Sequence, residues 1–420
     1  MTSPAQPAHR RLRDKPGFGI YYTARTVAWT GNVMSLVALP IMVFQLSGSA
    51  TLTGLVTALE AVPYLLLGLL VGALADRWDN RRVMALWAAV PGVAMVTVPL
   101  AQLAGRLTTG QLLAVALVVG IAFVFADAAS FGALPVLVGR DLLAQANSTL
   151  GATYSVLSIT GPAVAGVIIA TVGTPWVLGI DGIGCMIAAL LLTRLPWTHE
   201  RVAANARRAL RADMSEGLAF IWRHPVIRPL TFMGIGNSIT SGIVGGLLVV
   251  VASQSLGLSQ QDGRLGLLFT AAAAGSVAGS LLLPRLQRTV TIGVLTIASY
   301  AAIAIAAIVL AGLTWWVAAA VVLAVMNLTS TVITLNGIVA RQTLTPIRLQ
   351  SRVNTTARMI AWGGAPAGAV IGGLVATAWG VNVALLVGAA GTTTALAVGV
   401  VAGVGSLTYL RSMEPAADEV

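Results

Sequence analysis

Charged residues are scarce in this sequence. Asp, Glu, Lys and Arg together make up 9% of its 420 residues, whereas 57% of the residues are hydrophobic. A soluble protein needs a charged surface, and this composition supplies too few charges to make one. The mean hydropathy of +0.88 points the same way. We therefore expect an integral membrane protein.

Cysteine and histidine are also scarce. The one cysteine, Cys185, lies in an apolar run, and the three histidines, His9, His199 and His224, are far apart in sequence. One cysteine permits neither an internal disulfide nor a thiolate metal site. We expect the histidines to be solvated loop residues. The sequence therefore predicts no metal centre.

Catalytic and nucleotide-binding motifs are missing as well. The sequence contains no Walker-type phosphate loop and no Ser–His–Asp set on a soluble scaffold, and these patterns carry ATP-driven and hydrolytic chemistry. An intramembrane enzyme needs a cluster of nucleophile, base or metal ligands, and a receptor needs a sizeable extramembrane domain. We expect neither class, and we expect no cofactor.

Acidic residues are outnumbered by basic ones. The chain has 14 Asp and Glu against 25 Lys and Arg, which gives a net charge of +11. The arginines flank apolar runs and do not cluster on a soluble domain, so we expect no nucleic-acid partner. The amino-terminal tail and the even-numbered loops hold most basic residues, whereas the odd-numbered loops hold Arg106 and Arg264. The positive-inside rule then places both termini in the cytoplasm and the chain in the inner (plasma) membrane.

Long apolar runs make up most of the chain. A bilayer span needs about 20 predominantly apolar residues. The expected spans are roughly 18–46, 51–75, 83–104, 111–135, 145–172, 176–196, 228–254, 264–284, 290–312, 314–341, 352–378 and 381–406. The segment between the sixth and seventh carries Leu210, Met214, Leu218 and Ile221 at helical spacing. This spacing predicts an amphipathic helix on the membrane surface.

The two halves of the sequence repeat each other. A constant shift of 207 residues pairs Gly68 with Gly275, Asn147 with Asn354, Gly161 with Gly368, and Gly166 with Gly373. Parallel repeats of this kind are related by an axis along the membrane normal. We expect an all-α integral membrane fold of twelve transmembrane helices, in two six-helix bundles related by a pseudo-two-fold axis along the membrane normal. The bundles are expected at 1–196 and 228–420, joined by a cytoplasmic linker at 197–227.

Ionisable residues inside expected spans are the strongest functional candidates. They are Arg25, Glu60, Asp127, Asp181 and Arg358. Each costs roughly 2.5–3.5 kcal/mol at mid-bilayer, so each is expected to face a cavity or a partner. The three acids are candidate proton-coupling residues. The alternatives are a structural hydrogen bond or a position near the outer rim for Glu60, pairing with Arg25 or Arg358 for Asp127, and helix packing for Asp181.

One face of the first span combines a cation, a ring and an amide. Arg25, Trp29 and Asn32 are spaced i, i+4 and i+7, so they share a helix face. This face is suited to an anionic or aromatic ligand, although Arg25 can instead extend to the cytoplasmic surface. Further candidates for substrate contact are Tyr154, Asn327, Arg358 and Trp362, and weaker ones are Asn237 and Asn336.

Two glycine–proline segments are expected to bend their helices. Gly161-Pro162 lies in the fifth span, and Gly363-Gly364-Ala365-Pro366 lies in the eleventh. Proline frees a backbone carbonyl, and small residues allow close packing. We interpret Gly161 and Pro162 as gating residues that act as the halves move. Plain helix packing is the alternative.

A charged loop at 72–82 joins the second and third spans. Asp76 lies there at a helix end, close in sequence to Arg77, Arg81 and Arg82, and Gly72 precedes them. A charged turn cannot lie in hydrocarbon, so this loop is expected at the cytoplasmic surface, where acid–arginine pairs hold the bundles together. We predict a gating role for these residues. The repeat places Leu283 opposite Asp76, so the second copy lacks the acid.

This loop is similar to the signature G-x-L-A-D-R-x-x-x-R-R of the major facilitator superfamily. Other stretches resemble its drug- and siderophore-efflux branch, which includes macrolide and enterobactin exporters. They are Val37–Pro40, Leu46–Ala50, Leu134–Arg140, Glu216–Phe220 and Arg358–Gly373. The resemblance implies alternating access by a rocking motion, outward transport and proton antiport. Gly161-Pro162 lies where that branch has its antiporter motif.

The first span departs from the branch. This chain has Asn32 where many members have an acid, and Arg25 where many have glutamine. The change removes a proton site and adds a cation, so we expect a neutral or anionic aromatic substrate such as a siderophore or natural product. The predicted function is a monomeric proton antiporter that exports a small amphipathic molecule, with protons and membrane lipid as its other partners. A proton-coupled uptake permease and a lipid flippase are the alternatives.

Overall fold

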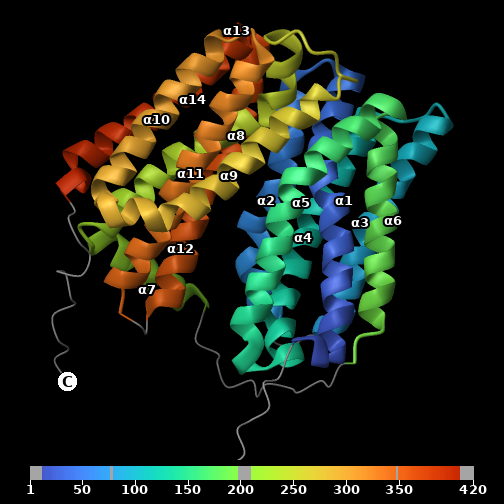
Figure 1. Cartoon of the computed structure of the whole chain (residues 1–420), viewed down its shortest axis with the longest axis horizontal. Coiled ribbons are helices and arrows are strands. Elements are labelled where there is room, and N and C mark those ends of the chain that lie inside the picture. The colour runs from blue at the N-terminus through green and yellow to red at the C-terminus, as the bar shows by residue number, and fades with distance from the viewer. Residues whose placement is uncertain (1–11, 76–78, 197–209, 347–348, 407–420) are drawn as a thin grey trace, which may run out of the picture.

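The fold is a bundle of long helices (Figure 1). The computed structural model describes residues 12–75, 79–196, 210–346 and 349–406. Within these ranges, twelve helical segments are long and apolar enough to cross a membrane, and no β-strand occurs. The predicted all-α, twelve-span architecture is therefore confirmed.

The first half runs from α1 to α6. Its helices are α1 (Pro16–Ser47), α2 (Ala50–Ala75), α3 (Asn80–Leu103), α4 (Thr109–Val138), α5 (Leu143–Thr171) and α6 (Thr174–Thr193). After α7 (Leu210–Arg223), the second half contains α8 (Ile227–Gln254), α9 (Arg264–Thr289), α10 (Ile292–Gly312), α11 (Trp316–Leu344), α12 (Gln350–Trp362), α13 (Gly364–Trp379) and α14 (Val381–Val401). The domain boundary itself stays a prediction.

The eleventh span is broken into α12 and α13 at Gly363. Pro366 has no N–H, so it cannot donate to the carbonyl of Trp362 one turn earlier. The Ser238 hydroxyl of α8 donates to that carbonyl instead, at 3.4 Å. The helix is thus interrupted at one residue, Gly363, and a neighbouring helix satisfies the freed backbone group. By contrast, α5 continues unbroken through Gly161 and Pro162.

The sequence repeat is also a repeat of packing. Gly161 of α5 lies against Val33 of α1, and its repeat partner Gly368 of α13 lies against Ile239 of α8. In both places a side chain on the glycine would overlap the facing helix. Small residues therefore set the same close approach of two helices in each half.

The halves join through backbone contacts at one end of the molecule. A Cβ on Gly166 of α5 would lie 2.6 Å from the Gly263 carbonyl oxygen, next to the start of α9. A Cβ on Gly373 of α13 would lie 2.9 Å from the Ala50 carbonyl oxygen at the start of α2. Thr51 also donates a hydrogen bond to the Gly373 carbonyl at 3.1 Å. We call this end of the bundle the far end.

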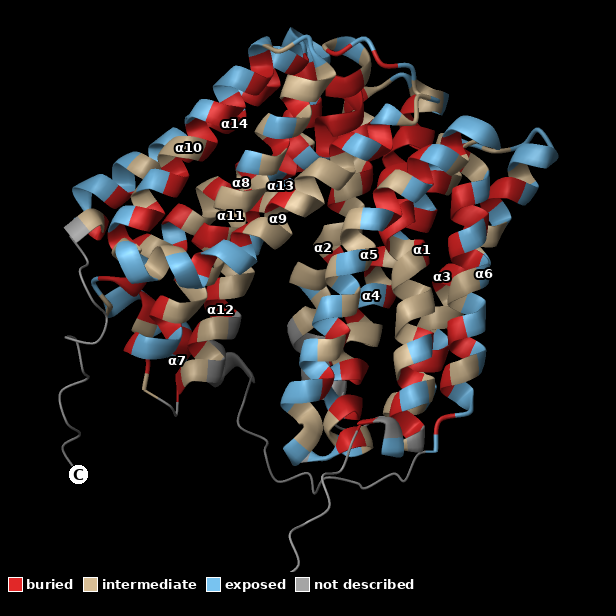
Figure 2. Ribbon diagram, viewed as in Figure 1, coloured by how far each residue is buried: buried red, intermediate tan, exposed pale blue. Residues whose placement is uncertain are grey.

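The opposite end carries the start of α1 and the ends of α6 and α14, and we call it the terminal end. Figure 1 shows the ribbons of the two halves diverging toward it. Figure 2 shows that buried residues are dense where the halves meet, toward the far end. They include the run Val37–Phe44 of α1 and the run Leu247–Ala252 of α8. The structure is therefore fastened at the far end.

Helix α7 packs against the terminal end of α12. Ile221 is 1% exposed, whereas Leu218, expected on the same apolar face, is 47% exposed. The position of this helix on the membrane surface stays a prediction. Glu216 forms an ion pair with Arg352 of α12. His224 is not a free loop residue, because its Nδ1 accepts hydrogen bonds from the N–H groups of Val226 and Ile227 at 3.2 Å and so caps α8. Partial burial lowers the pKa of His224, which keeps this acceptor neutral.

Candidate functional site

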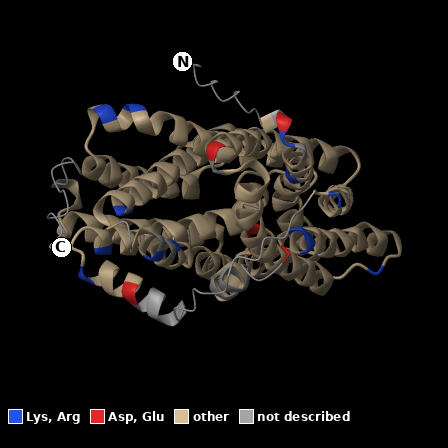
Figure 3. Ribbon diagram, turned by 90° about the horizontal axis from the view of Figure 1, so that it is seen from below, with Lys and Arg blue, Asp and Glu red and all other residues tan. Residues whose placement is uncertain are grey.

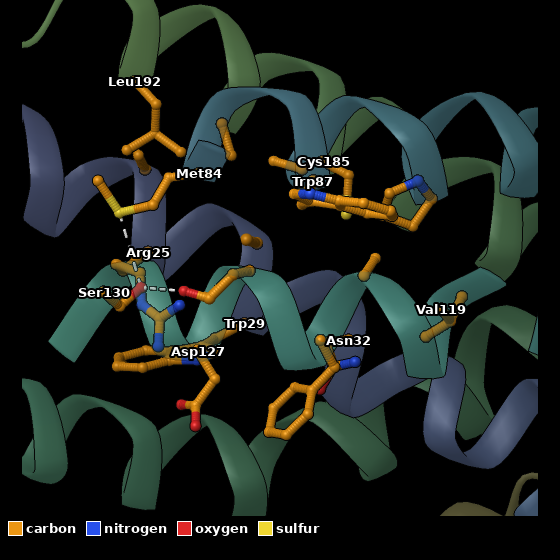
Figure 4. Close-up of a pocket in the computed structure, with 18 of the residues that line it drawn as sticks. Arg25, Trp29, Asn32, Met84, Trp87, Val119, Asp127, Ser130, Cys185 and Leu192 are labelled. Carbon is orange, nitrogen blue, oxygen red and sulfur yellow. Dashed lines mark hydrogen bonds between the residues drawn. The ribbon is translucent and has the colours of Figure 1, made fainter. Parts of the chain in front are cut away.

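Arg25, Trp29 and Tyr154 form one continuous group in the amino-terminal half. The Arg25 guanidinium carbon lies 4.5 Å from the centroid of the Trp29 ring. The Tyr154 ring of α5 meets Trp29 edge to face, with centroids 5.4 Å apart. Figure 4 shows Arg25 over Trp29 at the wall of a cavity. Arg25 thus lines this cavity, and its Nε is buried without a hydrogen-bond partner among the described residues.

Two adjoining cavities lie along these side chains. One has a volume of about 340 Å³ and lies between α1, α3, α4 and α6. Its wall includes Arg25, Trp29, Asn32, Trp87, Asp127, Tyr154, Asp181 and Cys185. The second, of about 400 Å³, shares Arg25, Trp29, Asp127 and Tyr154 with the first. These volumes suit a small ligand, and the walls are mainly apolar with a few polar groups, as is typical of ligand sites.

Asp127 of α4 lies between two arginines without direct contact. It forms no hydrogen bond or ion pair of 4 Å or less with another described residue, but the charges of Arg25 and Arg358 both act on its carboxylate. Arg25 belongs to its own half, whereas Arg358 belongs to α12 in the other half. No described contact pairs Asp127 with either arginine, and such a pairing stays a prediction.

Asp181 of α6 is deeply buried. It is 1% exposed and accepts a hydrogen bond from the Cys185 thiol at 3.4 Å, while its Oδ2 has no partner among the described residues. The missing side chain of Gly31 leaves the space that Asp181 fills against α1. The charge of Asp181 acts electrostatically on Glu60 of α2. Helix packing and proton binding both stay open as roles for Asp181.

A third cavity, of about 310 Å³, lies within the carboxy-terminal half. Its wall includes Asn237, Ser238, Ser330, Arg341, Asn354, Arg358 and Trp362. Arg358, Trp362 and Asn237 are sequence candidates. Arg341 and Asn354 are not sequence candidates. Arg341 lies at the edge of an expected span, so the sequence indicates a loop residue. Its position on the polar face of α11 is the signal that points to it.

Arg358 connects the two halves near the middle of the bundle. It donates a hydrogen bond to the Tyr64 hydroxyl of α2. Its guanidinium carbon lies 5.6 Å from the ring centroids of both Tyr64 and Trp362. The ring centroids of Tyr64 and Trp362 are 6.2 Å apart, and those of Tyr64 and Phe123 of α4 are 6.1 Å apart. Sequence reasoning did not single out Tyr64, because only the fold brings it to Arg358.

The remaining candidates lie apart from these cavities. Asn327 donates its amide to the Leu323 carbonyl of its own helix at 2.9 Å and does not line the three cavities described above. Gly161 and Pro162 pack α5 against α1 and α9. Their contacts are those of helix packing, and a gating role stays a prediction.

The charged loop is described in part. Asp76 and Arg77 lie outside the described residues, and Gly72 lies near the end of α2. Asp79 caps α3 by accepting from the backbone N–H groups of Arg81 and Arg82 at 3.1 and 3.3 Å. Arg82 also pairs with Asp79 at 3.3 Å, and Arg81 donates to the Leu195 carbonyl at 3.4 Å. These contacts hold Arg81 and Arg82 to their own half.

A twelve-span fold with cavities in both halves, closed at one end, defines a membrane transporter. Solved transporters share the fold. A bacterial homologue of the human lysosomal transporter Spinster, inward-facing and unoccupied, aligns with a TM-score of 0.75 at 14% identity, covering 96% of this chain and 100% of that chain. The nucleoside transporter NupG also aligns with a TM-score of 0.75 at 14% identity, covering 94% of this chain and 99% of that chain.

The model of the transmembrane secretion effector family matches residues 11–417, so the chain belongs to this family. It is 26% identical over 372 residues to the multidrug efflux pump Tap of Mycolicibacterium fortuitum, covering 86% of this chain and 90% of Tap. It is 25% identical over 370 residues to the enterobactin exporter EntS of Salmonella typhi, covering 86% of each chain. The predicted superfamily and efflux branch are confirmed, and these relatives are transporters, not enzymes. The chain is a multi-pass efflux transporter of the major facilitator type.

Proposed function

We propose that this protein exports a small aromatic molecule, neutral or anionic, from the cytoplasm by alternating access coupled to proton antiport. The observation that supports the substrate class is the pairing of arginine with aromatic rings in both halves. Arg25 stacks on Trp29, and Arg358 lies over Tyr64 and Trp362. Such groups offer a ring face for stacking and a cation for an acceptor oxygen. A siderophore or aromatic natural product combines both features.

The direction of opening follows from charge. The described basic residues at the terminal end include Lys15, Arg81, Arg82, Arg194, Arg223, Arg228, Arg285, Arg288 and Arg352. Figure 3, seen from below, shows Lys and Arg on both halves. The positive-inside rule places this end in the cytoplasm. With the halves joined at the far end, substrate enters the inner-membrane protein from the cytoplasmic side.

Asp127 is our candidate for proton coupling. As a carboxylate it attracts Arg358 across the two halves, and protonation removes that attraction. A proton that binds one conformation more tightly than the other shifts the equilibrium between them. In the proposed cycle, the protonated carboxyl belongs to the substrate-free return step. Glu60, half-buried in α2, and Asp181, buried in α6, are the other candidates in the same half.

Efflux from proteoliposomes tests this proposal. Enterobactin, the cargo in the name of one relative, serves as an aromatic probe. Wild-type protein is expected to transport it faster when an imposed pH gradient drives protons inward. Asp127→Asn should keep substrate binding but lose this acceleration, whereas Asp141→Asn, at an exposed position, should behave as wild type.

Three outcomes contradict the proposal. Equal acceleration in Asp127→Asn would exclude Asp127 as the coupling residue. An uptake permease would extrude substrate from everted vesicles, whereas an exporter accumulates it there. Failure to move any aromatic probe in either direction would reject the substrate class.

A further inference from the structure

The membrane part of the carboxy-terminal half contains no acid. Between residues 227 and 401 the sequence has one acidic residue, Asp262. It lies in the α8–α9 loop at the far end, where Arg264 donates to it at 2.9 Å. These hydrogen bonds lower the pKa of Asp262, so it is charged and occupied by Arg264. Glu60, Asp127 and Asp181 all belong to the amino-terminal half. Within the described membrane segments, the acids thus belong to the amino-terminal half, whereas Arg341 and Arg358 belong to the other half.

Arg341 is a buried cation within the membrane part of this half. The residue is 7% exposed, and its Nε donates to the Asn354 Oδ1 of α12 at 3.3 Å. Gly337, one turn earlier in α11, leaves the space beside the guanidinium, since a Cβ there would lie 3.3 Å from Nη1. Arg341 forms no ion pair with a described side chain. A buried cation without a countercharge is costly, so the site is poised to accept an anion.

The surrounding side chains complete an anion site. Arg358 shares the same 310 Å³ cavity, and one hydrogen bond to Tyr64 leaves most of its five N–H donors free. Asn237 donates to the Ser330 hydroxyl at 3.0 Å, and the hydroxyl proton of Ser330 can then point elsewhere. Trp362 and Ala361 supply an apolar wall. The cavity therefore offers two guanidinium groups, neutral donors and a ring surface.

We infer that this cavity binds the carboxylate or other compact oxyanion of the transported molecule between Arg341 and Arg358, with its ring toward Trp362. The inference rests on the proposed function and specifies the subsite that selects charge. Asp127 does not line this cavity, so the anion and the coupling proton occupy separate sites. That separation allows an antiporter to carry an anion without placing it beside a carboxylate.

Binding of matched probes to the purified protein in detergent tests the inference. The probes are naphthalene-2-carboxylate and naphthalene-2-carboxamide, which differ in charge but hardly in shape. Hydrogen bonds to charged groups are the strong ones, so Arg341→Gln should weaken carboxylate binding by about 10- to 100-fold and carboxamide binding by less than about threefold. Arg341→Lys should give an intermediate loss. Arg228→Gln, an exposed arginine of α8, should change neither.

Asn354→Asp keeps the test decisive where Arg341→Gln fails to fold. The new carboxylate is isosteric with the amide and gives Arg341 an internal countercharge. Carboxylate binding should fall at least about tenfold, while carboxamide binding stays and the melting temperature does not fall. Equal losses for both probes, or unchanged carboxylate binding in both variants, would overturn the inference. Transport of the carboxamide by wild-type protein separates this failure from failure of the proposed function.

Discussion

Arginine side chains inside this bundle contact aromatic rings, although carboxylates are the usual partners of buried arginine. Arg25 stacks on Trp29, Arg358 lies over Tyr64 and Trp362, and Asp127 acts on both arginines only from a distance. A ring face offsets part of the cost of burying a cation without neutralising its charge. The guanidinium groups therefore stay available to an anionic ligand.

The Arg25 position gives a direct prediction for transport. Arg25→Gln removes the cation and its stacking on Trp29, interactions worth about 0.5–2 kcal/mol. Efflux of an anionic aromatic substrate at limiting concentration should fall by about 3- to 30-fold. Arg25→Lys should rescue it only in part, because an ammonium group does not stack as a planar guanidinium does.

Efflux from proteoliposomes measures this loss. Arg106→Gln, at an exposed position in the loop between α3 and α4, is the control and should transport at the wild-type rate. Unchanged efflux of every anionic substrate tried in Arg25→Gln would remove Arg25 from the site.

The sequence predicts site residues well where spacing along one helix determines which side chains share a face. Arg25, Trp29 and Asn32 share one helix face, and the structure places all three on a single cavity wall. Tyr64 and Asn354 could not be found this way, because each acquires its partner only when α12 packs beside α2 and α11. Their roles depend on tertiary contacts that no local pattern encodes.

At the scale of helices, glycines determine how closely the halves approach. Gly166 faces the backbone at the start of α9, and Gly373 faces the backbone at the start of α2. The sequence predicts this pair through the 207-residue shift, and it also predicts a bend in the eleventh span. It does not predict that α5 stays uninterrupted, because the local signal, a glycine–proline segment, is similar in both spans.

A larger side chain at this junction should open the far end. Gly166→Leu places a side chain against the Gly263 and Gly266 backbone, and overpacking of this kind costs about 1–3 kcal/mol. Combining Cys185→Ser with Ala50→Cys gives a chain with one cysteine as the reporter. Ala50 lies where α2 meets α13, and it is 6% exposed. Labelling of the introduced cysteine by a membrane-impermeant maleimide should rise by about fivefold or more.

Gly245→Leu is the matched control for this experiment. Gly245 lies on α8 in the same region, and a Cβ there meets nothing within 4 Å. With Gly245→Leu, the labelling rate of the introduced cysteine should equal that of the single-cysteine reporter without a leucine substitution. The same rise in both leucine variants would show that the effect is general loosening of the fold.

In the whole molecule, basic residues are concentrated at the terminal end. The acids within the described membrane segments belong to the amino-terminal half. The terminal end carries arginines of both halves, whereas the described far end carries Arg106 and the Asp262–Arg264 pair. This distribution predicts topology. A fluorescent protein fused to the carboxy terminus should fluoresce, and alkaline phosphatase fused there should be inactive. The same phosphatase fused within residues 104–108 should be active, and the reverse pattern would contradict the proposed direction of transport.

The break at Gly363 divides the eleventh span into two rods joined end to end. The outer rod, α13, is docked on α2 by its glycines, while the inner rod, α12, carries Arg358 and Asn354 and is braced by Glu216 of α7. We expect the interruption at this depth to let the inner rod swing while the outer rod remains docked. Closing the cytoplasmic side and releasing the substrate at the far end are then expected as two successive movements, with the substrate enclosed between them.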